Sequence, residues 1–102
     1  MSKSSNPVNR MAAPTQTLST SYGAAIVIPV GAINPIADLD DTAIAFTVQD
    51  QGTNTPEEAV PAGSAWSGGN VERTLGRAVT IKVKAASGTP NLNVIWFEET
   101  QP

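Results

Sequence analysis

VTIKVKAASGTPNLNVIWF occupies residues 79–97, and its two halves differ in pattern. Apolar and polar residues alternate from Val79 to Lys84, which is typical of a strand with one buried and one solvent-facing side. The second half, LNVIWF, alternates only at its start, because Ile95 and Phe97 add apolar side chains to the face that alternation leaves for solvent. The stretch therefore predicts two strands, the second of which is apolar on both faces.

We expect these strands, at about 78–85 and 91–98, to form a hairpin through their Gly- and Pro-containing connection. Within a lone domain, the second apolar face could be covered by the N-terminal segment or by a loop at 31–41. The alternative is coverage by another subunit, because an uncovered apolar face beside a strand edge promotes aggregation. We favour a subunit interface over this face, which carries Ile95 and Phe97.

Further segments of strand type precede this stretch. The segment 24–30 places Ile26 and Ile28 on one face, and Pro29 predicts a sheet edge or a bulge there, since proline cannot donate to a ladder. The segment 42–49 also alternates clearly. The expected strands are 17–22, 24–30, 42–49 and an irregular 59–66, and the expected connections are 31–41, 50–58 and 67–77.

Helical signals are weak along the whole chain. TPEE at 55–58 fits a capping box with Thr55 as the N-cap, but the prolines and glycine that follow predict no more than one turn. Several short strands with Gly- and Pro-rich connections predict an all-β fold: a single-domain antiparallel β-sandwich or a small jelly-roll-like barrel. Residues 17–102 would form this domain. Residues 1–16 are polar, lack periodicity and predict a flexible N-terminal arm.

The composition restricts the possible functions. The chain has no Cys and no His, so disulfides, thiolate metal sites, a Cys nucleophile and the commonest general base are all missing. Six basic residues are scattered through a chain of net charge −3, which argues against nucleic-acid binding. The longest apolar run is too short to span a membrane. We therefore expect a non-enzymatic protein without cofactor or metal, made in a cytoplasm.

The acidic cluster ADLDDT at 37–42 is a candidate cation site, because Asp38, Asp40 and Asp41 could offer converging oxygens. The spacing lacks the terminal bidentate Glu of an EF-hand. Aspartates in turns more commonly accept hydrogen bonds from nearby backbone amides. The cluster therefore favours a turn over a metal site.

Trp66 lies between small residues in GSAWSGG, where strand alternation does not explain a large indole. Two interpretations stay open: a plug that closes one end of the sandwich, or an anchor for a partner or a sugar. Tyr22 and Trp96 could complete an aromatic platform with Trp66, although no spacing brings the three together.

Three segments, SYGAAIVIPVGA (21–32), VPAGSAW (60–66) and the opening stretch 79–97, resemble small virion structural proteins of tailed bacteriophages. The resemblance covers about residues 20–97 and implies a β-sandwich that decorates or cements the capsid, or that sits at the neck or tail. It implies no catalytic residue. It also implies that a terminal arm, here 1–16, bridges neighbouring subunits.

The leading hypothesis is therefore a capsid decoration or cement protein in a virion. It would bind the major capsid protein, or other virion proteins, as a homo-oligomer and most favourably as a trimer, gaining avidity from several modest contacts. The alternatives are a neck or tail accessory protein, a carbohydrate- or receptor-binding module, and a monomeric β-domain. The residues expected to contact partners are Arg10, Tyr22, Trp66, Ile95 and Phe97.

Overall fold

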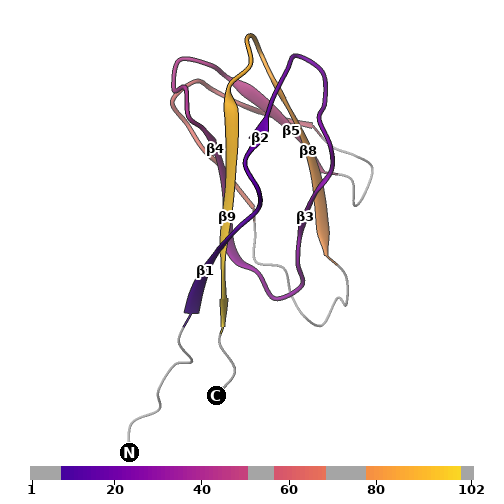
Figure 1. The fold of residues 1–102 in the computed structure, drawn as a ribbon, viewed down its shortest axis with the longest axis vertical. Coiled ribbons are helices and arrows are strands. Elements are labelled where there is room, and N and C mark those ends of the chain that lie inside the picture. The colour runs from indigo at the N-terminus through magenta and orange to yellow at the C-terminus, as the bar shows by residue number, and fades with distance from the viewer. Residues whose placement is uncertain (1–7, 51–56, 69–77, 100–102) are drawn as a thin grey trace, which may run out of the picture.

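The structure, a computed structural model, describes residues 8–50, 57–68 and 78–99. The described residues form two packed antiparallel sheets without helices (Figure 1). Sheet A contains β1 (Val8–Ala12), β2 (Gln16–Thr17), β4 (Ile33–Leu39), β7 (Trp66–Ser67) and β9 (Asn91–Glu99); sheet B contains β3 (Ile26–Ile28), β5 (Phe46–Asp50), β6 (Glu57–Val60) and β8 (Val79–Ala85). The prediction of an all-β sandwich is confirmed.

β9 lies at the centre of sheet A. β4 pairs with one side of it, and β1 and β2 pair one after the other with the opposite side. β7 pairs with the far side of β4. Sheet B has the order β3-β8-β5-β6, so β3 and β6 are its edge strands. The edge position predicted for the Pro29 segment is thereby confirmed.

The core consists of the inward-facing side chains of both sheets. On β8, for example, Ile81 and Val83 are fully buried, whereas Lys82 and Lys84 on the other face are only half-buried. This period of two follows from the alternation of side chains along a strand. The largest fully buried core residues are Leu18, Ile28, Pro35, Val48, Ile81, Val83 and Leu92.

The predicted hairpin is wrong. β8 belongs to sheet B and β9 to sheet A, so the connection between them crosses from one sheet to the other. Gly88 turns the chain at a φ of 67°, and the carbonyl of the buried Pro90 accepts a 2.8 Å hydrogen bond from the Leu18 amide. A hairpin would place β8 and β9 side by side in one sheet. The observed arch instead stacks their apolar faces across the core.

The predicted loop at 31–41 is also wrong, because most of it forms β4. Asn34 adopts a φ of 54°, and the register with β9 shifts between Ile33 and Ile36, so a β-bulge accommodates the turn-forming Asn-Pro pair. From Pro35 onward the buried side chains alternate as in a regular strand: Pro35, Ala37 and Leu39.

Two further expectations need correction. The capping box at 55–58 predicted a helical turn, but Glu57 and Glu58 begin strand β6. They pair with β5 across from Gln49 and Val48, so their backbone groups are used in a ladder. Thr55 and Pro56 lie outside the described residues.

The expected arm over 1–16 differs from the structure in part. Residues 8–12 form β1, which continues sheet A as an edge strand, and Gln16 begins β2. All five residues of β1 are exposed, so this strand adds to the sheet without entering the core. Residues 1–7 lie outside the described residues, as does most of the expected connection 67–77. The strand expected at 17–22 is limited to the end of β2.

Candidate functional site

The outer face of sheet A, which points away from sheet B, carries two rows of side chains. Residues directly opposite each other in antiparallel strands share a face. The first row joins Arg10, Phe97 and Ile33 across β1, β9 and β4. The second row joins Ala12, Ile95 and Ile36.

We call Ile33, Ile36, Ile95 and Phe97 the apolar patch. All four are half-buried. Among the described residues the two sheets are the only layers, and no third layer covers this face. The patch therefore lies on the solvent side of the sandwich with part of each side chain accessible.

The patch is not covered in either of the ways expected for a lone domain. Residues 8–12 run beside β9 as its neighbour in the sheet, and the segment 31–41 contributes β4 itself. Strand β1 also adds exposed apolar surface at the end of sheet A, with Val8 52% and Met11 38% exposed. The sequence located Ile95 and Phe97 but missed Ile33 and Ile36, because the loop assigned to 31–41 concealed their strand.

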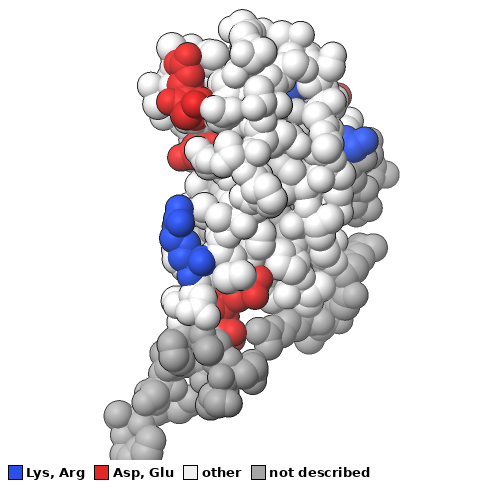
Figure 2. Space-filling view, viewed as in Figure 1, with Lys and Arg blue, Asp and Glu red and all other residues white. Residues whose placement is uncertain are grey.

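Polar groups border the patch. Asp38 and Asn93 form the next cross-strand pair along β4 and β9, and the Thr15 hydroxyl donates a 3.3 Å hydrogen bond to Asn93 Oδ1. Arg10 lies at the opposite border, on β1 beside Phe97. Figure 2 shows groups of acidic and basic side chains along one side of the molecule. An apolar centre with a polar rim is the usual composition of a protein-protein interface.

Tyr22 lies on the other side of the molecule, over the outer face of sheet B. Its hydroxyl donates a hydrogen bond to Glu57 Oε1, and Lys84 Nζ lies 4.7 Å from the centre of its ring. Burial and the hydrogen bond to Glu57 raise the pKa of Tyr22 to about 12. The ring and the hydroxyl are therefore both engaged within the chain.

Trp66 is buried in the core, with 8% of its surface exposed, and pairs across β7 and β4 with Ala37. A Cβ atom at Gly68 would lie 2.5 Å from Trp66 Cη2, so the indole packs against the bare backbone of that glycine. The small residues around Trp66 thus make room for a core side chain. This placement agrees with the plug rather than with the anchor.

The three aromatic residues do not form a platform. Trp96 is buried on the inner side of sheet A, where its Nε1 donates a 2.7 Å hydrogen bond to Glu98 Oε2. Trp66 lies in the core, whereas Tyr22 lies over the opposite side of sheet B. No spacing in the sequence predicted a platform, and the topology separates its members.

The acidic cluster has structural hydrogen bonds. The Asp40 carboxylate accepts bonds from the backbone and the side-chain nitrogens of Asn91, at 2.9 and 3.2 Å. The Asp41 carboxylate accepts a 3.0 Å bond from the Ala43 amide. Among the described residues, no group of three or more His, Cys, Asp and Glu side chains could hold a metal ion. The described part of the chain also contains no helix long and apolar enough to cross a membrane.

Comparisons with protein-family models, with curated proteins and with solved structures found no match for this chain.

Proposed function

We propose that the chain is a non-enzymatic structural protein of a tailed-phage virion, and that it decorates or cements the capsid by binding the major capsid protein. The apolar patch on the outer face of sheet A carries this proposal. Apolar surface exposed to water costs roughly 25 cal/mol per Å², and that cost is removed when another polypeptide covers it. The resemblance to small virion β-sandwich proteins is the reason for proposing a phage particle as the assembly.

The position of the patch supports binding to protein rather than to a small ligand. It lies on the outer face of sheet A, spans the two adjacent strands β4 and β9 and borders the exposed strand β1. Flat apolar surfaces with polar borders suit large, shape-complementary interfaces, whereas small ligands favour concave sites. We propose that Ile95, Phe97 and Arg10 contact the partner, and that Trp66 acts only in the core.

The proposal includes assembly as a homo-oligomer, most favourably a trimer. A trimer that spans a junction between capsid subunits would combine three modest contacts, so the second and third form at high effective concentration. The carbohydrate-binding alternative has lost its support, because Trp66 is buried and the Tyr22 ring faces Lys84.

The test is mass spectrometry of purified virions from the source of this sequence, with quantification of the chain relative to the major capsid protein. We expect the chain in many copies per particle. Antibody labelling in electron micrographs would then distinguish a distribution over the shell from a ring at one vertex, which would indicate a neck or tail protein. Absence of the chain from the particles would refute the proposal.

A further inference from the structure

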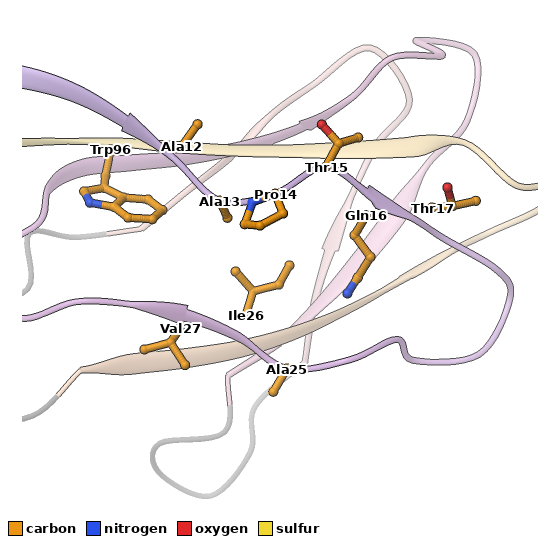
Figure 3. A pocket seen from close by; sticks show the side chains of 10 residues that line it. All are labelled: Ala12, Ala13, Pro14, Thr15, Gln16, Thr17, Ala25, Ile26, Val27 and Trp96. Atoms are coloured by element: carbon orange, nitrogen blue, oxygen red, sulfur yellow. The ribbon is translucent and has the colours of Figure 1, made fainter.

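A groove runs along one side of the sandwich, where β2 of sheet A and β3 of sheet B lie opposite each other (Figure 3). It has a volume of about 560 Å³. One wall consists of the segment from Ala12 to Thr17, and the other of Ala25 to Val27. Trp96 extends into it from β9. The groove is separate from the apolar patch, which lies on the outer face of sheet A.

No residue that lines the groove is charged. In Figure 2 the central part of the face in view, over β9 and the neighbouring side of β3, is likewise free of Lys, Arg, Asp and Glu side chains. Apolar side chains such as Pro14, Ile26 and Trp96 line the groove together with the polar Gln16, and polar and apolar atoms contribute similar shares of its surface. An occupant of this groove would therefore be uncharged and would present both polar and apolar groups.

The edge strand β3 beside the groove differs in charge from the edge strands β6 and β1. Natural proteins protect exposed sheet edges with charged residues, with proline and with short strands, which oppose the addition of another strand. The edge strand β6 carries Glu57 and Glu58, and β1 carries Arg10. β3 has the uncharged sequence IVI and exposes 57% of Val27, and its protection is limited to its short length and to the Pro29 that follows it.

β3 pairs only with β8 among the described strands, so its other edge faces the groove side without a neighbouring strand. An extended peptide can add to such an edge through main-chain hydrogen bonds, with its alternate side chains directed toward the adjacent hollow. A three-residue strand offers an edge of roughly 10 Å, at about 3.3 Å per residue. This length suits a short segment rather than a long strand.

The side chain of Gln16, in the groove wall, contains one polar atom without a hydrogen-bond partner. Its Nε2 donates a 3.1 Å hydrogen bond to the Ala24 carbonyl, which fixes the orientation of the amide. Its Oε1 is buried without a hydrogen-bond partner, close to Gly23. A buried acceptor without a partner is destabilising and calls for an explanation. In contrast, the neighbouring Thr15 and Thr17 hydroxyls already donate to asparagine side chains.

We infer that the groove binds an uncharged, extended segment of another protein chain, which adds as a strand to the free edge of β3. The apolar side chains of this segment would pack against Ile26 and Trp96. A small adjustment of the Gln16 amide would let Oε1 accept a hydrogen bond from the segment. The uncharged edge of β3, which has no neighbouring strand among the described residues, distinguishes this occupant from a small apolar molecule, which needs a hollow but no strand edge.

The experiment uses the full chain labelled with ¹⁵N and the peptide acetyl-Val-Thr-Val-Thr-Val-amide. We expect saturable shifts of amide resonances confined to residues 12–17 and 25–28. Methylation of alternate backbone nitrogens in the peptide should weaken binding about tenfold or more, because it removes main-chain donors. Replacement of both threonines by glutamate should weaken binding similarly, because the groove offers these charges no partner.

Three variants test whether the edge of β3 is the binding site. Val27→Lys places a charge on β3 and should abolish binding, whereas Val27→Thr should retain it. Val8→Lys changes a valine of similar exposure, 52%, on β1 and should bind the peptide as the native chain does. Three results would each overturn the inference: no shifts, equal binding of the methylated peptide, or undiminished binding by Val27→Lys. Concentration-dependent shifts at the same residues without peptide would also overturn it, in favour of a second copy as the occupant.

Discussion

Sheet A and sheet B are similar in construction, but their outer faces have opposite chemistry. On sheet B the cross-strand rows join Ala59, Thr47 and Lys84, and then Glu57, Gln49 and Lys82. On sheet A the corresponding rows contain the four residues of the apolar patch. Both inner faces are apolar, as a two-layer core requires. The outer face of sheet B thus has the composition expected for contact with water.

The difference shows which part of the surface the fold itself does not need. The apolar residues on the outer face of sheet A lie outside the core. They therefore do not make the sandwich more stable than polar residues at the same positions would. Ile95 and Phe97 gain only partial burial from their neighbours within sheet A. Their chemistry is explained when another polypeptide covers them, and this is the basis of the proposed structural role.

The largest expected effect separates Trp66, a buried aromatic residue of sheet A, from Phe97, a half-buried one. Trp66→Ala should lower the free energy of unfolding by about 3–5 kcal/mol, because it removes a core indole and leaves a cavity. Phe97→Ala should cost clearly less, since that ring is half-buried. Urea denaturation followed by circular dichroism measures both. If the alanine variant at position 66 does not fold, Trp66→Phe should give a smaller loss in the same direction.

The opposite ranking would overturn this assignment of roles. If Trp66→Ala leaves the unfolding free energy unchanged but weakens assembly, Trp66 is the partner anchor and not the plug.

The second prediction compares the two outer faces by placing the same charge on each. Phe97→Glu should weaken assembly about 100-fold or more, which corresponds to about 2.7 kcal/mol, because it buries a charge in the interface. Thr47→Glu, on sheet B beside Lys84, should leave assembly unchanged. Sedimentation equilibrium measures both constants. Equal assembly of the two variants would show that the patch is not the interface.

The sequence predicted the strands whose side chains alternate without interruption. β3 and β8 lie within predicted segments, and β5 and β9 each extend one residue beyond theirs, because a period of two is a local property of the chain. It failed for β4, where Asn34 and Pro35 suggested a turn although they form a bulge within a strand. The alternation of buried side chains from Pro35 to Leu39 was the signal that could have revealed this strand.

Strand partners were not predictable in the same way. β8 and β9 are separated by a short connection with Gly and Pro, and such a connection suits both a hairpin and an arch between sheets. The choice depends on hydrogen bonds that are distant in sequence, such as those from Asn91 to Asp40. The sequence did predict that both faces of 92–97 are apolar, and β9, which carries them, lies at the centre of sheet A. The patch could therefore be predicted only on β9, and its half on β4 required the structure.

A smaller effect concerns the polar face of sheet B. Tyr22→Phe removes the hydroxyl that donates to Glu57 and should lower the free energy of unfolding by about 0.5–1.5 kcal/mol. A double-mutant cycle with Glu57→Gln isolates the energy of this pair. Assembly should not change, because the pair lies away from the apolar patch. A loss of assembly in Tyr22→Phe would assign part of the interface to sheet B.

The last prediction concerns pH, and it uses the fact that Tyr22 is the only tyrosine in the chain. Ultraviolet titration of the folded protein should place its ionisation near the raised pKa of about 12, above the ordinary value of 10.0. Because the folded state holds this proton more tightly, the contribution to stability is complete below pH 10 and is lost as the pH rises toward 12. The stability of Tyr22→Phe, measured over the same pH values, must be subtracted so that only the contribution of the tyrosine hydroxyl remains. Glu57→Gln should move the ionisation back toward 10, because it removes the negative charge and replaces a charged acceptor with a weaker, neutral one. An unchanged titration in that variant would mean that burial alone raises the pKa and that the polar face is not organised around Glu57.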